Sequence, residues 1–208
     1  MTAKTDATTT ATAREPGVTA KGRATRARLL AAAQEQLRQH GTLEIADVAA
    51  AAGVAQSVIH RYFGNKAGLV EAVVSSFYDD YDQAVFLADL ATDAGWLDRE
   101  ALRIEQEVAF LYDHPLGRRV ASGLLHDAAA TRVDAERTRQ HADMAAKNIR
   151  KGQSSGELPD TVNPDLVGAA IIGALRAVLA AALSLDEPPS RDEVVATVTA
   201  LSRPLLQS

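Results

Sequence analysis

The 208-residue sequence contains no cysteine, which excludes disulfide scaffolds, cysteine-ligated zinc sites and thiol nucleophiles. Aromatic residues are also scarce, at 4% of the chain, so the composition does not single out a site for a flat aromatic ligand. The absence of cysteine is compatible with a reducing compartment. We therefore expect a cytoplasmic location.

Two common enzyme patterns are missing as well. The five histidines include no pair spaced four residues apart around a glutamate, which is the arrangement of zinc hydrolases. No glycine-rich phosphate loop is present. We predict no catalytic residue, no metal site and no cofactor. An enzyme remains an alternative, which substrate turnover and failure to bind DNA would support.

The sequence predicts neither a secretory signal nor a membrane-spanning helix. Seven of the first twenty residues are threonine and no apolar stretch accompanies them, so we predict a disordered tail over 1–20 rather than a secretory signal. The longest apolar run, 167–185, has Arg176 at its centre. Because a central arginine costs about 3 kcal/mol on membrane insertion scales, this run predicts a packed helix and no membrane partner.

Charge is unevenly distributed along the chain, whose net charge is −5. Residues 1–66 contain nine Lys/Arg and five Asp/Glu, a net charge of +4, and the remainder contains thirteen bases and twenty-two acids, a net charge of −9. A basic amino-terminal third on an acidic body is typical of a protein in which one region contacts phosphates.

Nearly every ordered segment shows the helical 3.6-residue period, and no run alternates as a strand does. We predict an all-α fold of about nine helices. Start and stop signals, including Thr42, Asn65, Asp98, Thr131 with Asp134, Asn163 and Ser190 with Glu193, place them at about 25–39, 43–52, 56–63, 66 to beyond 81, 98–112, 115–129, 131–153, 164–183 and 190–205.

The segment 48–66 is the most informative stretch of the chain. An alanine-rich apolar run stops at Gly53, and a short amphipathic segment over 56–63 follows. Two short helices joined by a turn containing glycine form a helix-turn-helix, whose second helix enters the DNA major groove. Helical geometry turns Val54, Ile59 and Phe63 inward and leaves a polar side outward. Taken alone, that polar side could equally be a solvated helix face.

The last two predicted helices carry more apolar surface than one neighbouring helix would cover. The 164–183 segment is apolar nearly all round, and Val194, Val198, Leu201 and Leu205 form a stripe on the next helix. We predict a homodimer formed through these two helices, over about 164–206, because isologous pairing is the commonest oligomer type. An intrachain core is the alternative.

These residues resemble the TetR family of bacterial transcriptional regulators. The resemblance is carried by Val48-Ala49, Ala52-Gly53-Val54, Tyr62-Phe63, Asn65-Lys66 and Leu69, and with the nine-helix layout it extends from residue 21 to the end. Three positions depart from the family pattern: Ala55 replaces a capping serine, His60 replaces a tyrosine that contacts phosphate, and Glu44 stands where a serine or threonine is common.

The resemblance implies a DNA-binding domain over 21–67 and an effector-binding and dimerisation domain over 68–208. Gln and Arg suit adenine and guanine edges, and basic or hydroxyl groups suit phosphates. The residues predicted to contact DNA are Gln56, Ser57, Val58, His60, Arg61, Tyr62 and Lys66. The basic residues over 21–28 are further candidates for DNA contact, but they could equally well be ordinary solvated side chains of the first helix.

The resemblance also implies a small-molecule effector of unknown identity, bound among the helices that follow residue 68. The pocket candidates are Phe77, Tyr81, Phe86, Trp96, Phe110, Tyr112, His126, Met144 and Asn148, of which we expect no more than about a third to line a cavity. The implied function is a regulator, with repressor preferred, that binds a palindromic operator as a dimer and leaves it when the effector binds. A helical interaction module that has lost DNA recognition is a further alternative.

Overall fold

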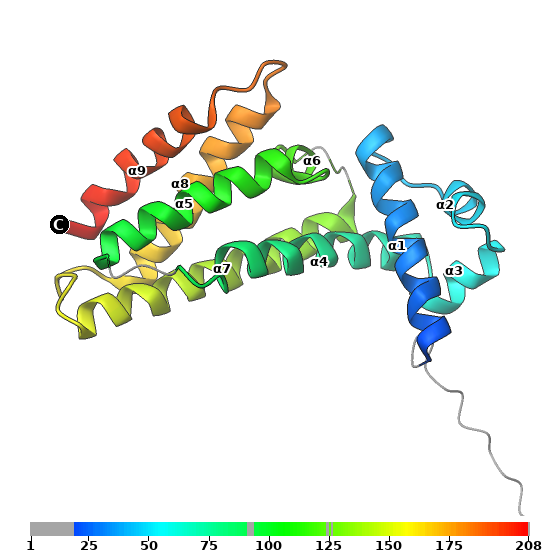
Figure 1. The fold of residues 1–208 in the computed structure, drawn as a ribbon, viewed down its shortest axis with the longest axis horizontal. Coiled ribbons are helices and arrows are strands. Elements are labelled where there is room, and N and C mark those ends of the chain that lie inside the picture. The colour runs from blue at the N-terminus through cyan, green and yellow to red at the C-terminus, as the bar shows by residue number, and fades with distance from the viewer. Residues whose placement is uncertain (1–18, 91–93, 124, 126, 208) are drawn as a thin grey trace, which may run out of the picture.

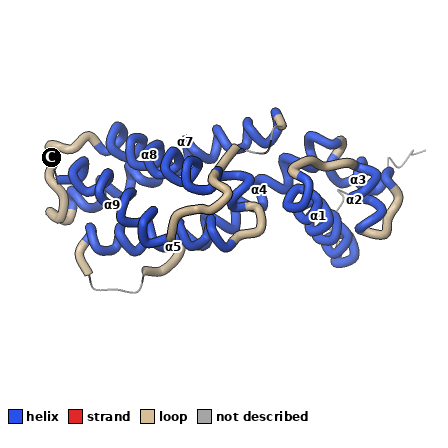
Figure 2. The backbone as a smooth tube through the Cα atoms, turned by 90° about the horizontal axis from the view of Figure 1, so that it is seen from above, coloured by secondary structure: helices blue, strands red, loops and turns tan. Residues whose placement is uncertain are grey.

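The computed structural model describes residues 19–90, 94–123, 125 and 127–207, and within these ranges it contains only α-helices as regular structure (Figures 1 and 2). The helices are α1 Ala20–His40, α2 Ile45–Ala51, α3 Gln56–Phe63, α4 Lys66–Val85, α5 Trp96–Asp113, α6 Gly117–Ala121, α7 Ala128–Ser154, α8 Pro164–Ser184 and α9 Arg191–Gln207. The prediction of an all-α chain with about nine helices is confirmed.

The helices form two groups that share α4. Helices α1 to α3 gather at one end of α4, and α5 and α7 pack along the remainder (Figure 1). Helix α8 packs on α7, and α9 packs on α5 and α8. One buried core runs through both groups, from Leu29 and Ile59 through Phe77 to Leu179. A smaller cluster around Trp96 and Leu206 closes the far end of the body. The amino-terminal helices are therefore anchored on the body by continuous apolar packing.

Several predicted helix ends are correct because the capping residue acts locally. The Asn65 side chain accepts a hydrogen bond from the Gly68 amide at 2.9 Å, and Asn163 accepts from Asp165 and Leu166 ahead of the Pro164 start. Ser190 accepts from the Glu193 amide at 3.3 Å at the beginning of α9.

Other predicted ends were wrong. Helix α1 begins at Ala20, five residues early, because Thr19 caps it. Helix α2 begins at Ile45 rather than 43, and its N-cap is Glu44 instead of Thr42. The predicted 115–129 helix is only the five-residue α6. Asp127, not Thr131, caps α7: its carboxylate accepts from the Ala129 and Ala130 amides.

Helix α8 is long and apolar enough, by length and composition, to cross a membrane. Its most extensive contacts are with α7 and α9, and its Arg176 donates two hydrogen bonds to the Asp134 carboxylate at 2.6 and 2.7 Å. An added Cβ at Gly168 would lie 2.9 Å from the Ala146 backbone nitrogen. The glycine therefore allows α7 and α8 to pack closely, and α8 is a core helix of this body.

Candidate functional site

The turns on either side of α3 set its position. Gly53 (φ 64°) and Gly64 (φ 75°) both adopt the left-handed backbone conformation that favours glycine, one before and one after the helix. Ile59 is fully buried, and Val54 and Phe63 are half-buried against the same core. The predicted inward side of α3 is therefore the packed side.

The opposite side of α3 is open to solvent. Gln56, Ser57, His60 and Arg61 are all exposed, and Val58 and Tyr62 are half-buried at its border. The Arg61 guanidinium lies 5.3 Å from the centre of the Tyr62 ring, a distance typical of a cation–π contact. The helix lies at the end of the molecule remote from α9 (Figure 1). The exposed side of α3 is therefore a candidate contact surface for DNA.

His60 makes a local contact that fixes its tautomer. Its Nδ1 lies 3.0 Å from the Gly64 carbonyl oxygen. Since a carbonyl oxygen only accepts, Nδ1 carries the hydrogen, and Nε2 is free to accept when the ring is neutral or to donate when it is protonated. The imidazole thus closes the carboxyl end of α3 and still presents one nitrogen outward.

Lys66, a predicted phosphate ligand, is exposed and forms an ion pair with Glu44, with Nζ and Oε1 2.8 Å apart. Glu44 is one of the three departures from the family pattern. A phosphate at the start of α4 would compete with this carboxylate for the Lys66 ammonium group. Glu44 should therefore weaken phosphate binding by Lys66.

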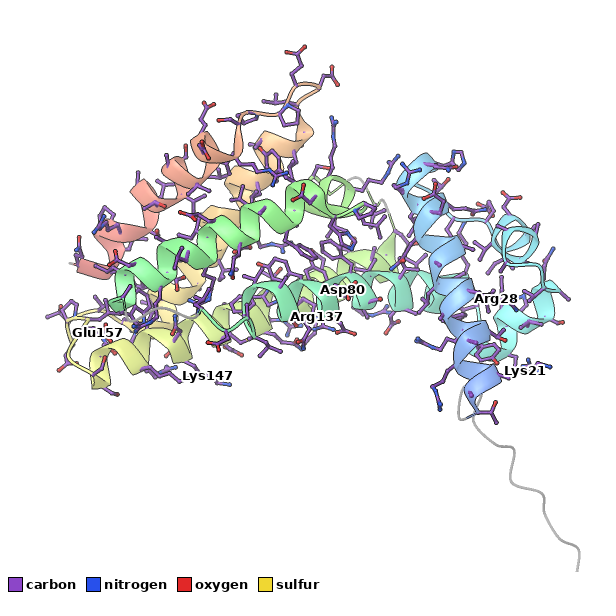
Figure 3. The ribbon with its side chains drawn as sticks, in the orientation of Figure 1. Lys21, Arg28, Asp80, Arg137, Lys147 and Glu157 are labelled. Carbon is purple, nitrogen blue, oxygen red and sulfur yellow. The ribbon has the colours of Figure 1, made fainter. Side chains whose placement is uncertain are left out.

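The basic residues over 21–28 lie on the first turns of α1, in the same group of helices as α3 (Figure 3). Lys21, Arg23, Arg26 and Arg28 are exposed. The Arg26 guanidinium lies 5.3 Å from the centre of the Phe63 ring, which links α1 to the end of α3. Because this segment is helical, it does not form an extended arm.

The body contains a cavity of about 290 Å³ between α5, α7, α8 and the end of α4. Its apolar wall includes Phe86, Ile104, Met144, Ile172 and Leu175. A larger hollow of about 810 Å³ runs between α5 and α9, but most of its lining residues are exposed, so it would remove little ligand surface from water. The smaller cavity is the better candidate for a small-molecule site.

Charged side chains enter the wall of this 290 Å³ cavity from α5. Glu100 and Arg103 form an ion pair there, and Glu107 is 6% exposed. Burial raises the pKa of Glu107 to about 7, opposed by the hydrogen bond that the Tyr81 hydroxyl donates to it, and burial also raises the pKa of Glu100. The wall of the 290 Å³ cavity therefore combines apolar side chains with the buried carboxyl group of Glu107.

His141, Asp82 and Arg137 form a second polar cluster, which lies near Glu107. His141 is 2% exposed, and its Nε2 lies 2.7 Å from Asp82, which also accepts from Arg137 at 2.8 Å. Burial lowers the pKa of His141, opposed by its bond to Asp82. The imidazole stacks on Phe86 at a centroid distance of 4.8 Å. This group links α4 to α7 at the edge of the cavity.

The predicted effector residues do not share one site. Phe86, Met144 and Asn148 line the 290 Å³ cavity, and Phe77 and Tyr81 border a separate 30 Å³ void. Phe110 stacks on His114, Trp96 donates to the Asn148 carbonyl at 3.1 Å, and Tyr112 donates to the Pro189 carbonyl at 2.9 Å. His126 lies outside the described residues.

The charged residues of α5 were not among the predicted effector residues. Glu100, Arg103 and Glu107 recur at the same helical spacing as the buried Ile104, Val108 and Leu111. Charges on the apolar side of an amphipathic helix are a sequence signal for a buried polar site. That signal was available from the sequence alone.

The sequence also contains one enzyme-like pattern. Residues 152–156 have the G-x-S-x-G spacing of a hydrolase nucleophile turn. The motif requires a strand that turns into a helix, but Ser154 is the last residue of α7 and its hydroxyl donates to the Arg150 carbonyl at 2.8 Å. The pattern therefore lacks the structural context that would make its serine a nucleophile.

The outer side of α8 and α9 is apolar and exposed. Leu166 is 70% exposed, Leu185 is 53% and Leu201 is 47%. Leu166 belongs to α8 and Leu185 follows its last residue, and the exposed Gly173 and Ala177 lie between them in sequence. In contrast, Val194 and Val198 are buried within the chain. The stripe predicted on α9 therefore divides into a buried side and an exposed side.

Sequence comparisons agree with this arrangement. Residues 29–73 match the model of the bacterial regulatory proteins, tetR family, which covers most of α1 and all of α2 and α3. The HTH-type transcriptional repressor LfrR of Mycolicibacterium smegmatis is 33% identical over 98 residues, which is 44% of this chain and only 51% of that repressor. An uncharacterised HTH-type transcriptional regulator of Mycobacterium tuberculosis is 28% identical over 171 residues, covering 81% of this chain and 71% of that protein.

Solved structures share the fold over nearly the whole chain. A TetR-family regulator from Rhodococcus sp. superposes with a TM-score of 0.69 at 18% identity, covering 88% of this chain and 98% of that one. FadR from Bacillus subtilis, solved in complex with stearoyl-CoA, gives a TM-score of 0.66 at 18% identity, with coverage of 87% and 97%. The resemblance to the TetR family is therefore confirmed: residues 29–73 match the family model, and the described residues share the fold of these solved regulators.

Proposed function

We propose that this chain is a dimeric transcriptional regulator that binds a palindromic DNA operator through α3. The observation that carries the proposal is the exposed polar face of α3, held between two glycine turns at the free end of the molecule. Gln56 and Arg61 supply the groups that bind adenine and guanine edges, and His60, Tyr62 and Lys66 supply phosphate contacts. A repressor in the cytoplasm is the form we favour.

The exposed leucines of α8 and α9 support the dimer. Leu166 of α8 and Leu201 and Leu205 of α9 are exposed on two helices that contact each other, and a second copy that covered them would remove apolar surface from water. Two copies joined about a twofold axis would present two α3 helices to successive major grooves, about 34 Å apart. The operator would then be a palindrome because the protein pair is symmetric.

A small-molecule effector would act by changing the spacing of the two α3 helices. A ligand that prefers the dimer with badly spaced helices lowers DNA affinity by its differential binding free energy. The proposed domains, 21–67 and 68–208, meet inside the continuous helix α4. Its tilt can therefore transmit a change from the 290 Å³ cavity to α3. The stearoyl-CoA bound by FadR supports a ligand site in this fold.

A mobility-shift assay with the DNA upstream of the gene tests the proposal. Gln56→Ala and Arg61→Ala should each cost about 1–3 kcal/mol of binding and relax preference at one base position. Arg139→Ala is the matched control, because Arg139 is exposed on α7 and bonds to Glu136 and to the Ala135 carbonyl of its own helix. Full sequence-selective binding by both α3 variants would refute this recognition surface and favour the interaction-module alternative.

A further inference from the structure

We infer that the 290 Å³ cavity takes a small organic cation, with its ammonium group on the Glu107 carboxylate and an apolar body against Phe86, Met144 and Ile172. This inference rests on the proposed function, because it names the ligand class of the proposed effector site. The cavity is at the lower end of the size range of small-molecule sites, so the ligand should be compact.

Glu107 is a buried acidic residue in the wall of the cavity. Its side chain is almost fully buried, and it borders both the 290 Å³ cavity and the 30 Å³ void. Its Oε1 accepts a hydrogen bond from the Tyr81 hydroxyl. Among the ion pairs of the described residues, none includes Glu107. A buried carboxylate without a cation is costly, and a bound cation would relieve that cost.

The charges that face Glu107 from the surrounding helices are already engaged. On its own helix α5, Arg103 pairs with Glu100. From α8, Arg176 pairs with Asp134 of α7. From α4, only the neutral Tyr81 hydroxyl reaches it, with the buried His141 of α7 beside that ring. Among the described residues, Glu107 is therefore a buried carboxyl group of the cavity wall that forms no ion pair, although Arg176 and Arg103 lie close enough to act on it electrostatically.

The lysines of α7 argue less strongly for an anionic ligand. Lys147 and Lys151 border the cavity but are exposed, and Lys147 projects away from the helical body (Figure 3). Water and salt screen exposed ammonium groups, so their attraction for a ligand is weak. A ligand cation next to the buried Glu107 is poorly screened by water, so its attraction to the carboxylate is stronger than that of an anion to the exposed lysines.

Isothermal titration calorimetry of the full chain with octylammonium, octanol and octanoate tests this inference. The three probes share one alkyl chain and differ in the charge of the head group. We expect octylammonium to bind at least tenfold more tightly than octanol, and octanoate to bind more weakly than both. Binding should also tighten about tenfold between pH 6 and pH 8, since Glu107 titrates near 7 while the ammonium remains charged.

Two variants identify the group responsible. Glu107→Gln keeps the size of the side chain and an oxygen for the Tyr81 hydroxyl, and it should abolish both the preference for octylammonium and most of its pH dependence. Any residual dependence would come from His141, whose protonation adds positive charge. Glu105→Gln is the matched control, because Glu105 is exposed on the same helix and borders the α5/α9 groove instead. It should leave binding unchanged.

The inference is overturned if octanol or octanoate binds as tightly as octylammonium, or if folded Glu107→Gln retains the preference. If that variant does not fold, the probe ranking and the pH profile of the unmodified chain decide. A mobility shift without any probe tests DNA binding separately. DNA binding with no octylammonium binding refutes only the ligand class; octylammonium binding without DNA binding refutes only the proposed function.

Discussion

Burial raises the pKa of the Glu107 carboxyl to about 7, because the ionised form loses its hydration. In the unfolded chain the same group titrates near 4.5. As pH rises from 4.5, the unfolded chain ionises first and is stabilised relative to the folded one. Folding stability is therefore lost between about pH 4.5 and 7, by an amount on the order of 3 kcal/mol at most.

Glu107→Gln should remove this loss. The variant should gain stability relative to the unmodified chain as pH rises from 4.5 to 7, and the gain should level off above 7. Urea unfolding at several pH values measures the difference, in which contributions common to both proteins, such as that of His141, cancel. Glu105→Gln serves again as the exposed control. A stability difference that stays constant with pH would show that Glu107 ionises normally.

At the scale of single residues, the sequence predicted which side chains are exposed better than it predicted which residues they contact. Period alone places Gln56 and Arg61 outward and Ile59 inward, because a helix face is set by local geometry. The same reasoning does not show that Lys66 meets Glu44, twenty-two residues away in sequence. Nor does it show that His60 bonds the end of its own helix, since that depends on the turn geometry at Gly64.

Gly68 determines how closely α3 and α4 approach. An added Cβ at this position would lie 2.1 Å from the Phe63 carbonyl oxygen, which belongs to the backbone and cannot move aside cheaply. Gly68→Ala should therefore destabilise the protein by about 1–3 kcal/mol. Thermal unfolding measures the change. Helix propensity alone predicts a gain of about 1 kcal/mol, so a stabilised variant would contradict the close approach.

Arg119 joins the body to the amino-terminal helices. From α6 it donates to the Arg38 and Gln39 carbonyls, at 2.9 and 3.1 Å, which lie in the last turn of α1. A cationic side chain at this end satisfies free carbonyls and favours the helix dipole. Arg119→Ala should cost about 1 kcal/mol and speed amide exchange near Gly41.

The neighbouring Arg118 provides the control for this prediction. It makes the same kind of bond, to the Leu185 carbonyl at 2.8 Å after α8, but does not reach α1. Arg118→Ala should leave exchange near Gly41 unchanged. Equal effects from both substitutions would show that α6 packing in general, rather than the contact with α1, holds the amino-terminal helices.

At the scale of elements, caps explain which helix ends were predictable. Asn65 and Asn163 cap their helices through their own side chains, so their sequence signal is local. The choice of Thr131 over Asp127 failed because both are good caps and the tertiary packing of Ala129 and Ala130 selects the earlier start. Helix α6 ends at Ala121, and Gly123 after it has a positive φ of 68°, so the predicted 115–129 helix does not continue.

The exposed leucines of α8 and α9 give a prediction for the whole molecule. Leu166→Glu should leave the fold of one subunit unchanged, because the side chain is 70% exposed, but it should bury charge in a dimer. Sedimentation analysis should show a shift from dimer to monomer at micromolar concentration. Leu87→Glu is the control, because Leu87 follows α4 and is 60% exposed. A monomeric unmodified chain, or a Leu166→Glu dimer, would refute the interface.

The sequence by itself determined the helical class, the approximate number of helices and the polar face of α3, because each follows from patterns repeated every few residues. Only the tertiary structure decided that Glu107 is buried without a cation, that Arg119 reaches α1, and that Phe86 and Met144 share a cavity while Trp96 and Tyr112 do not. These features join helices distant along the chain. Their separation in space depends on how apolar faces pack together, which no local pattern specifies.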